Sequence, residues 1–416
     1  MKDSGIDWIG KIPDEWKIKR LKFVSKNRNE KYDEQYGKLD YFSLENIESQ
    51  SGHYIETKNE YDISQSLICQ KDDVVFGKLR PYLAKVYKVE KISCCSSEFA
   101  IFYNFEGDSS FLKYYFLSDG FVKIVDSSTY GIKMPRANID FIRNMKVTFP
   151  SKSEQTKIAN FLDKKCAQID SIIEESKKSI EEYKSWKQSV IFEAVTGKNL
   201  SCKKKDSGIE WLGEIPEEWE VCKLKYLLKT NLQYGANSSG IEFNENLPRY
   251  VRITDIKSSE ALYEKGKLSL SEEDSIGYLL QDGDILFARS GATVGKTFLY
   301  HSNIGKAAFA GYLIRAQLNE NLNPKFLSYY TLSSGYDEWK NRIFIQATIQ
   351  NIGADKYANM EIPFPPLSEQ ESIAKFLDKK CTQIDSLISE KQSLIKDLAE
   401  YKKSLIFEAV TGKRRV

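Results

Sequence analysis

The chain of 416 residues contains the same frame twice, and this duplication constrains its fold more than any other feature. The segment DSGIDWIGKIPDEWKIKRLKFV begins at Asp3, and DSGIEWLGEIPEEWEVCKLKYL begins at Asp206. Further along, FLDKKCAQID from Phe161 matches FLDKKCTQID from Phe376. Repeats at this spacing predict two domains of one fold.

The interior of the repeat has diverged far more than its frame. The offset between the copies is 203 residues at the opening motif and 215 at the helix motif, so the second copy holds 12 extra residues. Weak matches remain inside, such as VVFGKLRPYLAKVY with ILFARSGATVGKTF. This pattern indicates two domains that perform one task on two different targets.

Each interior is rich in short strands. Apolar or aromatic runs such as AIFYNF and GYLIRAQL alternate with Gly, Asn, Asp and Ser, and brief helical pieces interrupt them. We therefore expect an α+β protein with two mixed α/β domains that have curled β-sheets. The predicted boundaries are domain 1 (1–150), a first helix (151–200), domain 2 (201–365) and a second helix (366–416).

The two helical segments carry a seam with alternating four- and three-residue steps, which is typical of a coiled coil. The seam positions are Leu162, Cys166, Ile169, Ile173, Ser176, Ile180, Tyr183, Lys187, Val190 and Ala194 in the first copy, and Leu377, Cys381, Ile384, Ile388, Lys391, Ile395, Leu398, Lys402, Leu405 and Ala409 in the second.

Helix boundaries can also be predicted. Ser151 with Glu154, and Ser368 with Glu371, have the spacing of capping boxes. The glycine of the repeated IFEAVTGK motif provides each helix end.

Helix length and linker length favour antiparallel pairing of the two helices. A helix of about 42 residues spans roughly 60 Å, which is longer than a domain of ~150 residues is wide. Only NLSCKKK separates the first helix from domain 2, so the second helix can meet the first only by running back. Polar seam residues such as Lys187 and Lys402 would fix the register. The alternative is that each helix packs only within its own domain.

Composition excludes several classes of protein. The formal net charge is +2, no run of 18 apolar residues occurs, and the N-terminal segment lacks the layout of a signal peptide. The seven cysteines form no CxxC pair, and only His53 and His301 are present, so a zinc site is not expected. Scattered free thiols are typical of the reducing cytoplasm.

The stretch ARSGATVGKTFLY, residues 288–300, resembles a phosphate-binding loop. However, only three residues separate Gly291 from Gly295 where the P-loop has four, and no amphipathic helix follows. The first copy has Ala84 where the second has Gly295. We interpret the stretch as a strand-end loop. No other catalytic motif occurs, and an active site based on histidine is nearly excluded.

Two loops in each copy are candidates for nucleic-acid contact. The first follows a strand and offers basic and polar side chains, and the second precedes the long helix and offers amides, an aromatic ring and basic groups, which suit phosphates and base edges. The candidates are Lys78, Arg80, Lys85, Tyr130, Lys133, Arg136 and Asn138 in the first copy, and Arg289, Ser290, Thr293, Lys296, Gln346, Thr348, Gln350 and Asn351 in the second. Solvated turns and polar surface loops are the alternative interpretation.

The chain resembles the specificity subunits of type I restriction-modification systems. The residues that carry the resemblance are GEIPEEWEVCKLKYL, GDILFARSGATVGK, PPLSEQESIAKFLDKK and FEAVTGK with their first-copy counterparts, and it runs from about Asp3 to Lys413.

The resemblance implies a non-catalytic, cytoplasmic subunit in which each domain reads one half of a bipartite, asymmetric double-stranded DNA site. It implies that the helices set the spacer and dock two methyltransferase subunits, and that restriction–translocase subunits join them. S-adenosylmethionine, ATP and Mg²⁺ would then bind to partner chains and not to this one. An NTPase and a protein-only coiled-coil adaptor are the alternatives.

Overall fold

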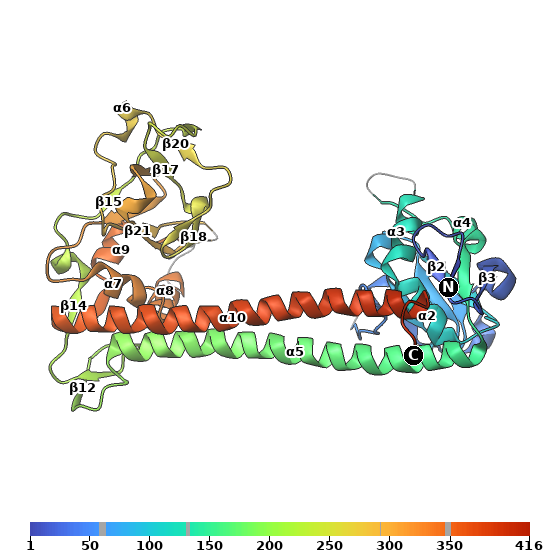
Figure 1. The fold of residues 1–416 in the computed structure, drawn as a ribbon. Coiled ribbons are helices and arrows are strands. Elements are labelled where there is room, and N and C mark those ends of the chain that lie inside the picture. Colours follow the sequence, from blue (N-terminus) through green and yellow to red (C-terminus); the bar gives the residue numbers. More distant parts are fainter. Residues whose placement is uncertain (58–63, 130–133, 292, 346–350) are drawn as a thin grey trace. The chain divides into compact units, whose positions relative to one another are not determined.

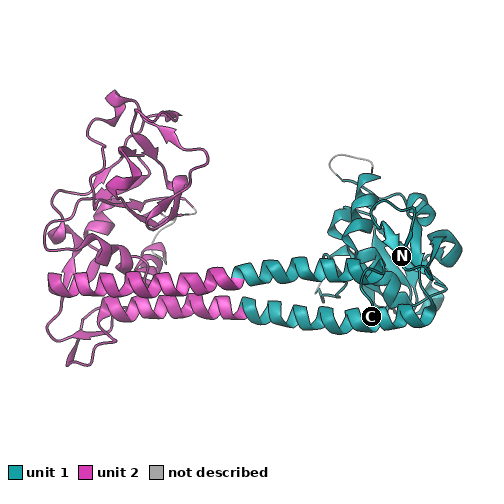
Figure 2. Ribbon diagram, viewed as in Figure 1, with its two compact units in different colours: residues 1–177, 392–416 teal, residues 178–391 magenta. Residues whose placement is uncertain are grey.

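The structure, a computed structural model, divides into two compact units (Figure 2). Unit 1 comprises Met1–Lys177 and Gln392–Val416, and unit 2 comprises Lys178–Lys391. Each unit is considered by itself below. The residues that the structure describes are 1–57, 64–129, 134–291, 293–345 and 351–416.

Unit 1 contains short strands in small, open sheets (Figure 1). One sheet has the order β4–β10–β7–β8 and another the order β5–β9–β6, in which β5 and β9 are parallel. Two further pairs are β1–β2 and β3–β11. The strands are β1 (Lys2–Asp3), β2 (Lys11–Ile12), β3 (Lys17–Arg20), β4 (Lys26–Arg28), β5 (Tyr41–Phe42), β6 (Leu67–Cys69), β7 (Val74–Gly77), β8 (Val86–Lys88), β9 (Ser93–Cys95), β10 (Phe99–Tyr103) and β11 (Lys146–Phe149).

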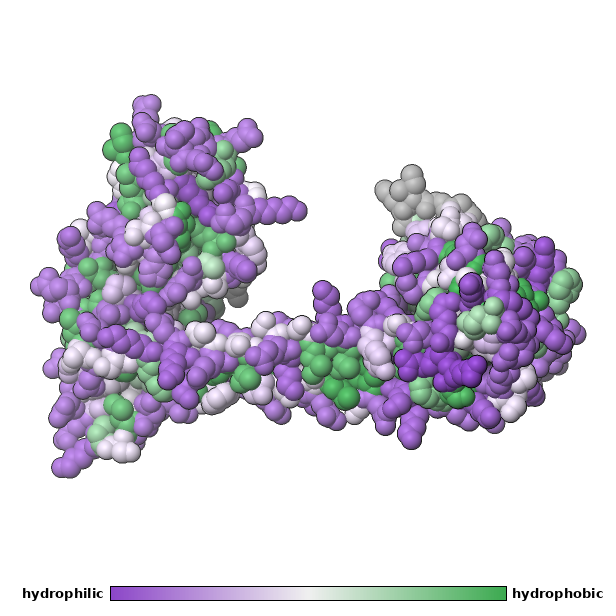
Figure 3. Space-filling view, in the orientation of Figure 1, coloured by the Kyte–Doolittle hydropathy of each residue, from purple (hydrophilic) through white to green (hydrophobic). Residues whose placement is uncertain are grey.

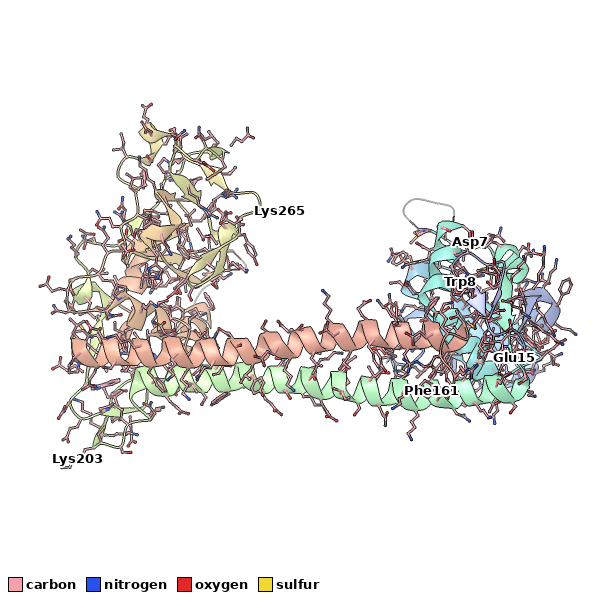
Figure 4. All side chains as sticks on the ribbon, in the orientation of Figure 1. Asp7, Trp8, Glu15, Phe161, Lys203 and Lys265 are labelled. Carbon is pink, nitrogen blue, oxygen red and sulfur yellow. The ribbon has the colours of Figure 1, made fainter. Side chains whose placement is uncertain are left out.

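Strand β7 is central in unit 1, because its side chains alternate between two hydrophobic cores. Val74 and Phe76 join the core under the helices, whereas Val75 joins the core between the sheets. Trp8 and Phe161 (Figure 4) border the first of these cores. The helices are α1 (Leu21–Val24), α2 (Ser109–Leu117), α3 (Asp119–Ser127), α4 (Ile139–Asn144) and α5 (Lys152–Thr196), with 3-10 turns η1 (Glu34–Tyr36), η2 (Leu44–Asn46) and η3 (Pro81–Leu83).

Unit 2 repeats this plan with a larger second sheet. Its sheets have the orders β15–β24–β21–β22 and β16–β20–β17–β23, and β17 and β23 are parallel. The remaining pairs are β12–β13, β14–β25 and β18–β19. The strands are β12 (Lys204–Asp206), β13 (Glu214–Pro216), β14 (Glu220–Lys223), β15 (Gln233–Tyr234), β16 (Ile241–Glu242), β17 (Arg249–Val251), β18 (Ile256–Ser258), β19 (Ala261–Leu262), β20 (Leu268–Ser269), β21 (Ile285–Ala288), β22 (Thr297–Leu299), β23 (Ala307–Phe309), β24 (Leu313–Ala316) and β25 (Glu361–Phe364).

Strand β21 has the position in unit 2 that β7 has in unit 1. Ile285 and Phe287 point into the core under the helices, and Leu286 and Ala288 point into the other core. Lys265, between β19 and β20, projects outward (Figure 4). The helices are α6 (Glu272–Ser275), α7 (Pro324–Tyr330), α8 (Ser334–Ile345), α9 (Ala354–Ala358) and α10 (Leu367–Val410), with 3-10 turns η4 (Leu224–Leu227), η5 (Ile253–Asp255) and η6 (Ser302–Ile304). The predicted mixed α/β fold of both domains is therefore confirmed.

The long helices α5 and α10 pair in antiparallel fashion inside each unit. In unit 1 the ammonium of Lys402 lies 2.6 Å from the carboxylate of Asp170, and in unit 2 Lys187 lies 2.7 Å from Asp385. Every position of the predicted seam is buried or half-buried. The two ion pairs occupy equivalent places of the repeat.

The start of α5 has the predicted capping box. The Ser151 hydroxyl accepts from the backbone N–H of Glu154, and the Glu154 carboxylate accepts from the backbone N–H of Ser151. The second predicted box, Ser368 with Glu371, is wrong, because α10 already begins at Leu367 and Ser368 lies inside the helix. The residue equivalent to Ser151 is Pro366, whose carbonyl accepts the first helical N–H groups.

Each helix end is held by the opening motif of one repeat. Gly412 ends α10 with φ +73°, and a Cβ at this position would lie 2.4 Å from Cδ of Pro13. In the same motif the Trp16 indole donates to Glu154 at the start of α5. Gly197, with φ +67°, ends α5 against Pro216 in the same way. The duplicated motif therefore joins the start of one helix to the end of the other in each unit.

Candidate nucleic-acid interface

The candidate site of unit 1 lies where β7 ends. The N–H of Lys78 donates to the carbonyl of Glu98 over 2.8 Å, and the carbonyl of Lys78 accepts from the N–H of Ala137 over 2.9 Å. Leu79 also forms a β-bridge with Arg136. The fold therefore brings the strand-end loop and the loop before α4 side by side.

The cluster in unit 1 carries mixed charge around a small cavity. Nη2 of Arg136 lies 2.7 Å from Oε1 of Glu98, and half of the Arg136 side chain is exposed. Burial lowers the pKa of the Lys78 ammonium; nearby Glu98 opposes this change and Arg136 adds to it. The cavity has a volume of about 330 Å³ and is lined by Lys78, Glu98, Arg136, Ala137, Asn138, Ile139 and Asp140.

Arg80 and Asn138 lie at the edges of this cluster. Arg80 is exposed and has a left-handed backbone with φ +51°, and its N–H donates to the carbonyl of Pro135. Asn138 is also exposed, but its side-chain oxygen already caps α4 by accepting from the N–H of Asp140. Only the amide N–H groups of Asn138 remain for a ligand.

The candidate site of unit 2 has the same backbone scaffold at the end of β21. The N–H of Arg289 donates to the carbonyl of Tyr312 over 3.0 Å, and its carbonyl accepts from Ile352 over 2.8 Å. Ser290 forms a β-bridge with Asn351. The Arg289 guanidinium carbon lies 4.8 Å from the ring centroid of Tyr234, so this side chain is held by cation–π stacking.

The glycine-containing loop of unit 2 is a turn between two strands. Gly291 and Gly295 have φ values of +82° and +80°, which favour glycine, and Gly295 donates its N–H to the carbonyl of Ala288. Strand β22 follows where a P-loop would continue as a helix. The geometry agrees with our prediction of a strand-end loop and speaks against a nucleotide-binding P-loop.

Two predicted contact residues instead have internal partners. The Lys85 ammonium donates to the carbonyls of Leu44 and Ile47, and that of Lys296 donates to the carbonyl of Ile256 over 2.7 Å. Each lysine therefore binds the carbonyl that follows a 3-10 turn. These contacts give Lys85 and Lys296 a structural role and correct the expectation that their charges face a ligand.

The other predicted contact residues differ in what the structure says of them. Ser290 and Thr293 are half-buried, and Asn351 is exposed. Five candidates lie outside the described residues, namely Tyr130, Lys133, Gln346, Thr348 and Gln350.

The structure adds three residues that the sequence analysis did not select. Glu98 precedes β10 and Tyr312 precedes β24, and each lies beside the strand-end residue of its unit. Tyr234 supplies the ring under Arg289. Strands β10 and β24 follow turns that contain Ser or Gly. Pairing these strands with β7 and β21 at the level of the sequence would have indicated Glu98 and Tyr312, but no feature of the sequence indicated Tyr234.

Within the described ranges, no cluster of His, Cys, Asp and Glu side chains is suited to hold a metal ion. None of the helices in that part of the chain is long and apolar enough to cross a membrane.

Fold and site together define a protein with two variants of one domain, which present different side chains from the same strand-end scaffold. Comparison with known proteins identifies the family. The model for the type I restriction modification DNA specificity domain matches residues 13–182 and 216–397, and the chain belongs to this family.

Individual proteins similar to this chain support the same family assignment. The MjaVIII specificity subunit of Methanocaldococcus jannaschii, a type I restriction enzyme component, is 25% identical over 83% of this chain and 76% of that protein. The StySPI specificity subunit of Salmonella potsdam is 24% identical over 66% of this chain and 58% of that protein.

Two solved structures share the fold. A chain from a type I R-M system, solved to explain complex assembly and conformational transition, aligns with a TM-score of 0.74 at 17% identity, over 97% of this chain and 100% of that chain. The HsdS subunit from Thermoanaerobacter tengcongensis aligns with a TM-score of 0.60 at 18% identity, over 97% of this chain and 98% of that chain.

Proposed function

We propose that this chain is the non-catalytic subunit that gives a type I restriction-modification complex its DNA sequence specificity. Each strand-rich domain reads one half of a bipartite, asymmetric site on double-stranded DNA. The observation that carries the proposal is the shared scaffold with exchanged side chains: Lys78 and Arg136 in domain 1 stand where domain 2 has Arg289 and Asn351. Such exchanges are what two different half-sites require.

A domain exchange tests this assignment. Residues 25–150 are replaced by the corresponding segment of another specificity subunit, and the DNA motif modified by the assembled complex is read by methylome sequencing. We expect one half of the motif to change while the other half stays the same. A change in both halves at once would show that one domain does not read one half-site.

The paired helices are the proposed docking site for two copies of a methyltransferase subunit. An apolar patch is visible on the helices of unit 1 (Figure 3). On α5 and α10 in this unit, the side chains of Ile172 and Tyr401 are 44% and 49% exposed. In unit 2 the equivalent residues of the repeat, Leu387 and Trp186, are 37% and 46% exposed. Equivalent exposed apolar pairs suit two copies of one partner.

Charge placed on one pair tests the docking proposal. We expect the double change Ile172→Asp and Tyr401→Asp to reduce the bound methyltransferase copies from two to one, as counted by native mass spectrometry. Changing the exposed polar residues Lys178 and Lys396 to Asp serves as the control. Retention of both copies by the first variant would contradict the docking face.

The chemistry of such a complex would reside on its partner chains in the cytoplasm. Methyl transfer would use S-adenosylmethionine there, and cleavage by restriction–translocase subunits would use ATP and Mg²⁺. Nucleotide binding by the isolated chain that is lost in Lys296→Ala would contradict this division of labour.

The helices are also the proposed spacer between the half-sites. Removal of one heptad from each helix shortens the pair by roughly 10 Å, which corresponds to about three base pairs. We expect the unspecified spacer of the DNA motif to shorten accordingly, and an unchanged spacer would refute the idea.

A further inference from the structure

Three side chains in domain 1 form one unit at the end of β7, and we call Lys78, Glu98 and Arg136 the strand-end triplet. Backbone hydrogen bonds of 2.8 Å and 2.9 Å hold Lys78 to Glu98 and to the residue after Arg136. The backbone positions of the triplet are thus fixed by the sheet, as a site that reads bases requires.

Domain 2 carries the equivalent triplet on the same hydrogen bonds. Arg289 takes the place of Lys78, Tyr312 that of Glu98 and Asn351 that of Arg136. The backbone is retained while all three side chains differ. The two domains therefore differ in the side chains that they carry at equivalent positions of one scaffold.

The domain 1 triplet offers both hydrogen-bond donors and an acceptor. The Arg136–Glu98 ion pair uses Nη2 and Oε1 at 2.7 Å, and the exposed fractions of the two side chains are 51% and 29%. The other guanidinium N–H groups of Arg136 have no partner among the described residues, nor does the Lys78 ammonium. A donor array therefore stands directly beside a carboxylate.

This arrangement matches one base pair better than any other. Guanine presents two acceptors, N7 and O6, in the major groove, and the paired cytosine presents the N4 amino donor beside them. Arginine or lysine donates to guanine, and glutamate accepts from cytosine N4. An A·T pair would instead place the thymine methyl group and O4 acceptor near the carboxylate.

We propose that the strand-end triplet of domain 1 reads a G·C base pair, with Arg136 and Lys78 donating to guanine and Glu98 accepting from cytosine. This inference rests on the proposed DNA-recognition function and adds the base pair and the residues that select it. Glu98 is the new element, because a carboxylate repels phosphates but can accept from a base donor while it holds Arg136 in place.

The contrast with domain 2 supports the assignment. Four arginines have a buried Nε without a hydrogen-bond partner, namely Arg143, Arg289, Arg315 and Arg342. Within the described part of the chain, Arg143, Arg315 and Arg342 form ion pairs through a terminal nitrogen of the guanidinium. Arg289 forms no such ion pair with the described residues and is only stacked on Tyr234. Domain 2 therefore has a guanidinium, a tyrosine and an amide but no carboxylate at its triplet.

The test uses the full chain assembled with its methyltransferase partner and a pool of DNA duplexes with randomised sequence. Bound duplexes are sequenced for the wild type and for Glu98→Gln, which keeps the size of the side chain and removes its charge. We expect the preference for G·C over the other pairs to fall by roughly 5- to 150-fold at one position of the domain 1 half-site. The domain 2 half-site should be unchanged.

Glu106→Gln is the matched control, because Glu106 is also a glutamate of unit 1 in an ion pair, at 2.9 Å from Lys19. Arg136→Lys is the second variant, which keeps the charge and loses the bidentate geometry. This variant should weaken the preference for G·C at the same position of the half-site.

The proposal is overturned if both variants keep the wild-type base preferences. It is also overturned if they weaken binding equally for all sequences with a smaller salt dependence, which would mark a phosphate contact. If the wild-type complex itself selects no bipartite motif, the proposed function fails instead, so the two failures are distinguishable.

Discussion

The two ion pairs between α5 and α10 occupy equivalent places of the repeat but differ in burial, and this difference yields a quantitative prediction. Lys402 is 8% exposed, and its partner Asp170 has a side chain that is 27% exposed. In the other pair the side chains of Lys187 and Asp385 are 27% and 57% exposed. Asp170→Asn and Asp385→Asn are thus matched changes in different surroundings.

The magnitude follows from what each change leaves behind. Asp170→Asn leaves the Lys402 ammonium buried without a counter-charge, and breaking a buried pair from one side costs about 3–5 kcal/mol. Because Asp170 is partly exposed and asparagine keeps an acceptor, we expect a lower value of about 2 kcal/mol. Ion pairs between exposed side chains contribute less than about 1 kcal/mol to stability, so Asp385→Asn should cost no more than that.

Hydrogen exchange measured by mass spectrometry provides the assay, because it reports local opening of each helix segment. A cost of 2 kcal/mol corresponds to about 30-fold faster exchange in peptides around 166–176 and 398–406. The double variant Lys402→Met with Asp170→Leu should return near the wild-type rate, because an apolar pair replaces the buried charges. Equal effects of Asp170→Asn and Asp385→Asn would refute the reasoning from burial.

Three further predictions concern a helix cap, a helix end and a buried ion pair. Ser151→Ala should cost about 1 kcal/mol by removing the cap of α5, seen as faster exchange in its first turn. Gly197→Ala should lower the thermal midpoint more than Gly208→Ala does, because both glycines have positive φ but only the Gly197 Cβ would meet a proline ring, at 2.5 Å; equal midpoints would argue against that contact. Burial raises the pKa of Asp73 above its ordinary 3.8, and Arg28 opposes this rise. The folded state therefore holds the Asp73 proton more readily than the unfolded chain, so stability falls as pH rises above 3.8, and Arg28→Met should cost more at pH 7 than at pH 4 in denaturant titrations.

The helices and the repeat were predictable because their signals are local. The four-and-three periodicity placed the seam correctly, and a seam that contains Lys187 and Lys402 foretold polar contacts across it. The cap at Ser368 was predicted wrongly from the same kind of local signal. The sequence offers a serine and a glutamate at the right spacing, but the helix already begins at Leu367, directly after Pro366, whose carbonyl accepts the first helical N–H groups.

The candidate site was predictable only as a set of loops. Lys78 and Lys85 are both basic and lie on either side of one turn, yet one stands at the surface cavity and the other donates to the carbonyls of Leu44 and Ile47. The sequence around a lysine does not indicate which backbone carbonyl lies within hydrogen-bond distance of its ammonium group. Glu98 was overlooked for the same reason, since its partner Arg136 is 38 residues away.

The sequence by itself determined that this protein has two related domains, two paired helices and a shared frame, because repetition and periodicity are properties of neighbouring residues. The tertiary structure decided which side chains of the loops stand together and which are used internally. That outcome depends on the hydrogen bonds between β7 or β21 and strands and loops far along the chain, which position Lys78 beside Glu98 and Arg289 beside Tyr312.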